Sequence, residues 1–96
     1  MSTTLHIEHP ITDFGTWKAA FDRVAPIRVK SGVLHHRVHR PVGEPNYVVV
    51  ALDFSTTAEA ESFLTFLETE IWSTADRSPA LAGKPRTKIL ESVEAQ

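Results

Sequence analysis

Alternating hydrophobic and polar positions predict four strands along the chain. In the first strand, Leu5 and Ile7 alternate with polar residues, and Pro10 is expected to end it because proline cannot donate a ladder hydrogen bond. The third strand contains three consecutive valines and has apolar residues on both faces, so it should lie in the centre of a sheet. The predicted strands cover residues 3–9, 33–40, 47–54 and 86–93.

Apolar residues at helical spacing predict two helical regions. The first follows Asp13, a good N-cap residue, and Pro26 should either kink it or make it restart before Gly32 ends it. Its apolar stripe consists of Phe14, Trp17, Phe21 and Val24. The second begins at a capping-box pattern formed by Thr56 and Glu59. Its buried face should consist of Ala60, Phe63, Leu64, Leu67 and Ile71.

The order strand, helix, strand, strand, helix, strand predicts an α+β, ferredoxin-like fold. Right-handed crossovers would place both helices on one face of a four-stranded antiparallel sheet. The short segment 41–46 between the second and third strands predicts a β-hairpin. Val49 and Ala51 would leave the other face of the sheet partly apolar, so we expect a second copy of the chain to cover it in a homodimer. Residues 1–96 are interpreted as one domain.

Composition and charge narrow the possible functions. The net charge of −2 and the scattered basic residues argue against nucleic acid as a partner. No apolar run approaches the ~18–20 residues of a membrane span, and the first residues do not resemble a signal peptide, so we expect a cytoplasmic protein without membrane association. The absence of cysteine excludes disulfides and a cysteine nucleophile. A chain this short should not enclose a deep cavity of its own, so a sizeable ligand site would need walls from a partner.

Four stretches of the sequence resemble the dimeric α/β-barrel superfamily: DFGTWKAAFD, the HRV and RP of the second strand, EPNYVVVALDF, and the closing PRTKILE. The chain is most similar to small actinobacterial-type members described as cyclases or antibiotic biosynthesis monooxygenases. The resemblance covers nearly the whole chain and implies the fold and the dimer. It also implies a cofactor-independent monooxygenase, cyclase or isomerase for a small aromatic or polyketide-like metabolite. The alternative is a non-catalytic small-molecule-binding or structural dimer.

The second predicted strand is unusually rich in histidine and arginine, and strand alternation sends His35, Arg37 and His39 to one face. A six-residue hairpin loop would instead bring His36 to that face. We prefer the other register, in which a bulge or a different loop length pairs His39 with Tyr47. The face lining the barrel would then carry His6, Glu8, His35, Arg37, His39, Tyr47 and Asp53.

These residues suggest general acid–base chemistry, because a histidine beside a carboxylate can be tuned to exchange protons near neutral pH. The predicted catalytic residues are His6, Glu8, His35 and His39. For substrate binding, Arg37 would hold an oxyanion, Tyr47 would donate a hydrogen bond and Trp72 would form an aromatic wall. A pocket for this chemistry is expected between the sheet and the helices of each subunit. The structural alternative is a polar network that fixes the register of the dimer.

Metal and haem chemistry are not expected. The Cα atoms of His35 and His39 would lie about 13 Å apart along a strand, too far for both side chains to bind one ion. A site made of His6, Glu8 and one histidine of the second strand is the remaining metal alternative. Haem-degrading members of the superfamily use an axial histidine on or just after the second helix, and this sequence has no histidine after His39. The sequence therefore predicts no metal and no cofactor.

Overall fold

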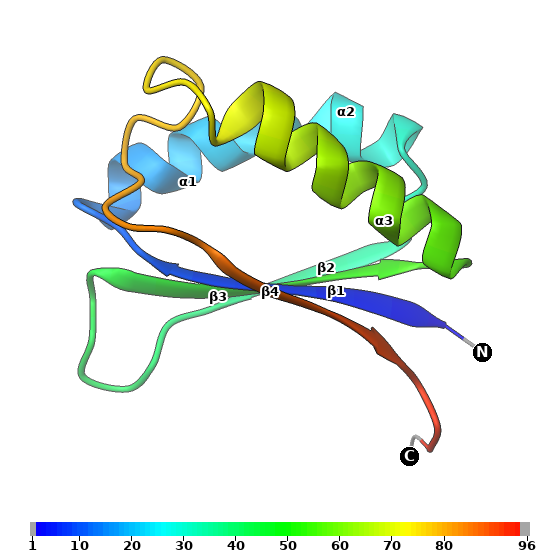
Figure 1. The fold of residues 1–96 in the computed structure, drawn as a ribbon. Coiled ribbons are helices and arrows are strands. Elements are labelled where there is room, and N and C mark those ends of the chain that lie inside the picture. Colours follow the sequence, from blue (N-terminus) through cyan, green and yellow to red (C-terminus); the bar gives the residue numbers. More distant parts are fainter. Residues whose placement is uncertain (1, 95–96) are drawn as a thin grey trace.

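The computed structural model describes residues 2–94 and contains a four-stranded antiparallel sheet with the strand order β2-β3-β1-β4. The strands are β1 (Thr3–Pro10), β2 (His35–His39), β3 (Tyr47–Phe54) and β4 (Arg86–Glu91). The helices are α1 (Phe14–Arg23), α2 (Ala25–Lys30), α3 (Thr57–Phe66) and the π-helix η1 (Leu67–Ile71). All of them lie on one face of the sheet (Figure 1), which confirms the predicted α+β, ferredoxin-like fold.

The two central strands, β1 and β3, alternate strictly between buried and partly exposed residues. The odd-numbered residues of β1 and the even-numbered residues of β3 face the helices, and Leu5, Leu52 and Phe54 are almost completely buried there. Phe63, Leu67 and Ile71 pack onto them from the helical layer. The core therefore lies between the helices and the sheet, where burial of apolar surface stabilises the fold.

The helix boundaries follow the predicted capping residues. Asp13 accepts a hydrogen bond from the Thr16 amide at the start of α1, and Thr56 forms a complete capping box with Glu59. The chain restarts as α2 with Pro26 in its first turn, where proline's missing N–H costs nothing. Gly32 follows α2 with a φ of 99°, a conformation that favours glycine.

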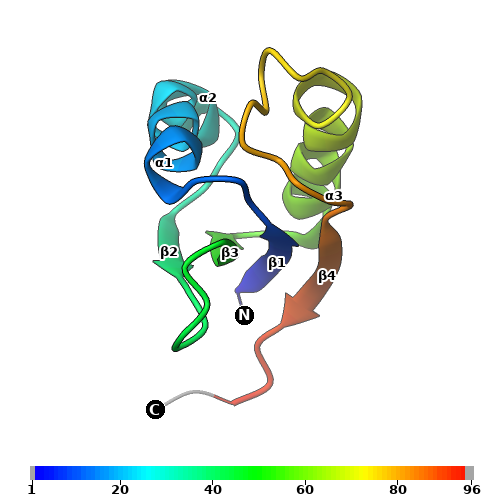
Figure 2. The ribbon, with the colours of Figure 1, turned by 90° about the vertical axis from the view of Figure 1, so that its left-hand side faces the viewer.

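The helical layer has two halves, which Figure 2 shows end-on. α1 and α2 lie over β2 and β3, whereas α3 lies over β1 and β4. The segment between η1 and β4 passes between the two halves at one end of the molecule. Hydrogen bonds from Thr12 N to Ala80 O (2.9 Å) and from Ala82 N to Pro10 O (3.2 Å) tie it to the end of β1.

The hairpin register differs from the preferred prediction by two residues. His39 pairs with Val49 rather than Tyr47, and Arg37 pairs with Ala51. The strand ends before Pro41, which lacks an N–H for the ladder, and the connection turns at Gly43, whose φ is 83°. An even shift leaves every side chain on the expected face, so the predicted grouping of the face is confirmed although the register is wrong.

Some strand boundaries also differ from the prediction. β1 ends at Pro10, which pairs with Tyr47, so the strand runs one residue beyond the predicted range 3–9 and proline ends it as expected. Pro10 stands at the last rung of the ladder, where a missing N–H is tolerated. β2 is shorter than residues 33–40 because the amide of Val33 still bonds the Arg28 carbonyl of α2. None of the helices within residues 2–94 is long and apolar enough to cross a membrane.

Candidate functional site

A cavity of about 80 Å³, here called the inner cavity, lies between the helices and the sheet. Its floor is formed by β1 and β3, and its sides are formed by α1, α2, α3, η1 and the segment 77–81. All of its lining residues belong to this chain, and the cavity is partly open to the surroundings. Its volume is small, so the expectation that a sizeable ligand site would need walls from a partner stays a prediction. The segment between η1 and β4 lies between the two halves of the helical layer (Figure 2), and its residues 77–81 line the cavity.

His9 is a polar residue on the floor of this cavity and is only 3% exposed. It is an odd-numbered residue of β1, like Leu5 and Ile7, so its side chain points toward the helices. Its Nδ1 lies 3.0 Å from the carbonyl oxygen of Pro10, which can only accept, so Nδ1 carries the proton of the neutral ring. Burial lowers the pKa of His9, because desolvation disfavours the imidazolium, and the bond to Pro10 offsets only part of this effect.

The other ring nitrogen of His9 is free to act on a ligand. No hydrogen bond among the described residues uses Nε2, and within the same residues no fully buried polar side-chain atom lacks a partner. Nε2 therefore borders open volume. In the neutral tautomer that Pro10 selects, this nitrogen holds a lone pair and can accept a proton. The arrangement is that of a general base in an apolar pocket.

Aromatic rings surround His9. The centroid of its ring lies 6.4 Å from that of Trp17 and 6.5 Å from that of Trp72, and both pairs are edge-on. Trp17 in turn stacks on Phe21 at 4.9 Å. The chain has two tryptophans, and both line the cavity. A planar aromatic ligand would find stacking and edge contacts here.

The π-helix η1 sets the side of the cavity nearest Trp72. The amide of Trp72 bonds the carbonyl of Leu67 at 2.7 Å, five residues earlier. The wider turn keeps Leu67 and Ile71 facing the sheet, and both line the cavity together with Trp72. Trp72 and Leu81 also line a second, more open depression beside η1 and β4, so the two hollows adjoin at these side chains.

The open face of the sheet, opposite the helices, holds most of the residues that the sequence suggested. His6 Nε2 lies 2.8 Å from Glu8 Oε2, and the Tyr47 hydroxyl donates to Glu8 Oε1 at 2.7 Å. These two hydrogen bonds lower the pKa of Glu8, and the bond to Glu8 raises the pKa of Tyr47. The three side chains therefore form a connected polar network on this face.

The other open-face residues extend this surface toward β2. Arg37 lies 3.5 Å from Asp53, whose other oxygen accepts a hydrogen bond from Thr4 at 2.7 Å. His35 and His39 are exposed. Across the described part of the chain, no three histidine or acidic side chains are placed to hold a metal ion together. His6, Glu8 and Tyr47 thus bond to one another and Arg37 to Asp53, and none of the open-face candidates lines the inner cavity.

Of the predicted site residues, Trp72 alone lines the inner cavity. His6, Glu8, His35, Arg37, His39 and Tyr47 all lie on the opposite side of the sheet. Their predicted roles stay predictions. Sequence reasoning missed His9, although the alternation of β1 could have found it, because His9 shares the apolar face of Leu5 and Ile7.

Comparisons with known proteins agree with this fold. No protein-family model matches the chain, and no curated protein matches it. SnoaB, a cofactor-independent oxygenase from Streptomyces nogalater, superposes with a TM-score of 0.74 at 15% identity, covering 98% of this chain and 95% of SnoaB. A Streptomyces coelicolor monooxygenase in complex with nanaomycin D superposes with a TM-score of 0.65 at 13% identity, covering 99% of this chain and 90% of that protein. A dimeric ferredoxin-like protein from an uncultured marine organism superposes with a TM-score of 0.69 at 19% identity, covering 99% of this chain and 97% of that protein.

The chain has the fold of these proteins. The fold implied by the sequence resemblance to the dimeric α/β-barrel superfamily is therefore confirmed. At such low identity, the likeness extends to the fold and leaves the activity to be argued from the site itself.

Proposed function

We propose that the chain oxygenates a small hydroxylated aromatic compound in the inner cavity without a cofactor. The observation that carries this proposal is His9, a buried neutral histidine whose Nε2 borders the cavity. Aromatic and aliphatic walls around it would contact the ring of a flat apolar molecule, and a ligand larger than the cavity would extend through its open side. SnoaB and the nanaomycin-bound monooxygenase, which share the fold, support oxygenation over other uses of a histidine base.

The proposed chemistry begins when His9 Nε2 removes the hydroxyl proton of the bound phenol. The phenolate gives one electron to O₂, and the resulting radical and superoxide combine at the para carbon as a hydroperoxide. Loss of the para C–H proton with cleavage of the O–O bond then leaves a quinone and releases water. For 1-naphthol, C₁₀H₈O and O₂ give C₁₀H₆O₂ and H₂O, so O₂ is the only oxidant needed.

We also propose that the open face forms a homodimer interface. Val49 and Ala51 lie half-buried at its centre, and Leu90 is 45% exposed on β4. The dimeric ferredoxin-like protein of the same fold supports this assembly. Light scattering should give twice the chain mass of 10.7 kDa, and Ala51→Glu should shift the protein to monomers. A monomeric wild-type protein would contradict the proposal. Action in the cytoplasm and the lack of nucleic-acid partners remain predictions from the sequence.

Oxygen consumption with 1-naphthol tests the function. We expect the purified protein to take up one O₂ per quinone formed, and ¹⁸O₂ to label the new carbonyl. His9→Phe keeps an aromatic ring of similar size and removes the base, so turnover should fall by roughly 10²-fold or more. His6→Phe is the matched control on the open face and should leave turnover nearly unchanged.

The pair of variants separates two locations for the chemistry. If His9→Phe retains turnover and His6→Phe loses it, the reaction belongs to the open face and the original sequence prediction is right. If wild-type protein binds aromatic compounds but consumes no O₂, the cavity is a binding site without oxygenase activity.

A further inference from the structure

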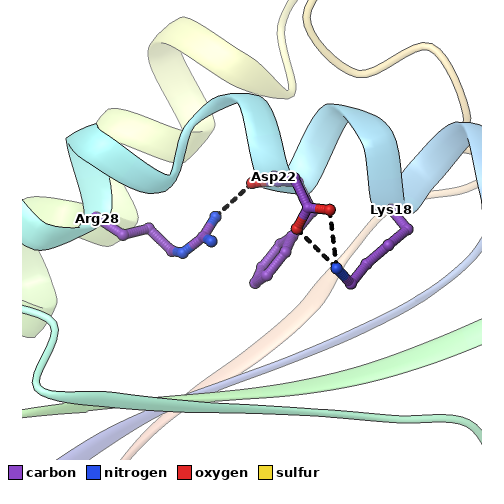
Figure 3. Close-up of polar contacts among 4 residues, drawn as sticks. Lys18, Asp22 and Arg28 are labelled. Atoms are coloured by element: carbon purple, nitrogen blue, oxygen red, sulfur yellow. Dashed lines mark hydrogen bonds and ion pairs between the residues drawn. The ribbon is translucent and has the colours of Figure 1, made fainter.

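Arg28 on α2 is a charged residue in the wall of the inner cavity and is only 5% exposed. Its Nη1 donates to the carbonyl oxygen of Phe21, near the end of α1, at 2.5 Å, and its guanidinium lies 3.7 Å from the centre of the Phe21 ring. Figure 3 shows the side chain reaching back from α2 beneath the end of α1. The carbonyl and the ring hold the guanidinium in place.

No carboxylate forms an ion pair with this guanidinium within the described residues. The nearest candidate, Asp22, receives two hydrogen bonds from Lys18 at 2.7 and 2.9 Å (Figure 3), and the ion pairs found here include none to Arg28. The lining of the cavity contains no aspartate or glutamate, and its only other charged residue is Arg77, a second cation. Burial lowers the pKa of Arg28, and the nearby charge of Asp22 offsets part of this effect; a guanidinium stays protonated at neutral pH in either case.

The hydrogen-bonding capacity of Arg28 is also largely unused. A guanidinium carries five N–H donors, and the bond to Phe21 uses one of them. No hydrogen bond among residues 2–94 involves Nε or Nη2, and none of their fully buried polar side-chain atoms lacks a partner, so these nitrogens border open volume. A helix-end cap alone would need neither the free donors nor a buried, unneutralised charge.

We infer that the ligand of the inner cavity is an aromatic anion whose carboxylate or other acidic oxygen binds the guanidinium of Arg28. Such an oxygen pair matches the planar fork of arginine and would neutralise the buried charge. Trp17 and Phe21 lie between Arg28 and His9 along the aromatic row, so the acidic group and the hydroxyl would occupy different ends of the ligand. The inference rests on the proposed function of the cavity and narrows its substrates to aromatic acids.

Benzoate and benzamide make a matched pair of probes, because they have nearly the same shape and only benzoate is charged at pH 7. Both tryptophans line the cavity, so tryptophan fluorescence reports binding of either probe. We expect the wild type to bind benzoate roughly 10-fold to 100-fold more tightly than benzamide at low salt, as a charge-assisted hydrogen bond implies. Arg28→Gln can still donate to the Phe21 carbonyl but has no charge, so it should lose this preference and keep its affinity for benzamide.

The inference would be overturned if the wild type bound benzoate and benzamide equally. It would also be overturned if Arg28→Gln kept the preference for benzoate. Either result would leave the proposed function standing. Binding of neither probe would refute the cavity as a ligand site, and the proposed function would fail with it. If Arg28→Gln does not fold, Arg28→Lys replaces it. The lysine keeps the charge without the fork, so benzoate affinity should fall while benzamide affinity stays the same; unchanged benzoate affinity would contradict the inference.

Discussion

Replacing Ala20 by leucine should fill the inner cavity from its α1 wall. Ala20 is partly buried and lines the cavity, whereas its neighbour Ala19 is exposed. Alanine and leucine are both good helix formers, so helix propensity changes little at either position. Any difference between Ala20→Leu and Ala19→Leu therefore reports on the cavity.

The expected magnitude follows from the cavity volume. At about 24 cal/mol per Å³, an empty volume of about 80 Å³ costs the fold about 2 kcal/mol. Leucine adds three carbons, and crowding against the surrounding side chains offsets part of the gain. We expect Ala20→Leu to raise the free energy of unfolding by about 1 kcal/mol, equal to a rise of about 4–8 °C in Tm for a domain of this size.

Urea unfolding and benzoate titration of the same samples measure both consequences. Ala20→Leu should be more stable than the wild type and should bind benzoate at least roughly 10-fold more weakly. Ala19→Leu should change the free energy of unfolding by less than about 0.5 kcal/mol and leave binding unchanged. A destabilised Ala20→Leu that still binds benzoate like the wild type would refute the reasoning, because the leucine would then have found no open volume beside the ligand.

Three further predictions concern stability. The pKa of His9 is lowered in the folded protein, so below about pH 6.5 the unfolded chain binds more protons than the folded chain. The free energy of unfolding should therefore decrease as the pH is lowered below that value. Thermal melts of His9→Phe should show a smaller decrease than those of the wild type. Gly32→Ala adds backbone strain and brings a methyl group onto the Glu59 carboxylate of the capping box, whereas Gly43→Ala adds strain alone. In urea unfolding, the free energy of unfolding should drop by about 2 kcal/mol for Gly32→Ala and by about 1 kcal/mol for Gly43→Ala. Equal drops for the two variants would contradict this account. The pKa of Glu8 is lowered in the folded protein, so Glu8 contributes stability above its unfolded pKa and loses that contribution as the pH falls through its folded pKa. Tyr47→Phe removes a hydrogen bond that lowers this pKa, so the loss of stability in acid should begin at a higher pH. Thermal melts between pH 2 and 6 measure this.

Much of the fold could be predicted because local signals and tertiary packing agree. The alternation in β1 and β3, the Asp13 cap and the Thr56 capping box each appear in the sequence and again in the structure. The hairpin register was not predictable to the residue, because Gly43 and the flanking prolines permit several loop lengths. The sequence left two registers of opposite parity open, and the structure has the parity of the preferred one, with Val48, Val50 and Leu52 toward the helices.

The candidate site was harder to predict because its residues come together only in the folded chain. The histidine-rich second strand drew attention to the open face, yet there Arg37 pairs with Asp53 of β3, and His35 and His39 are exposed. His9 could have been found by following the parity of β1 one step further. The position of Arg28 depends on the angle at which α2 restarts after Val24; Pro26 predicted a kink or a restart, but no local pattern specifies that angle.

The most direct test of the account is a crystal structure of the protein grown with 1-naphthol. The account predicts electron density for the ligand between Trp17 and Trp72, with its hydroxyl within hydrogen-bond distance of His9 Nε2. Ligand density against His6 and Tyr47 on the open face, with the inner cavity unchanged, would contradict it.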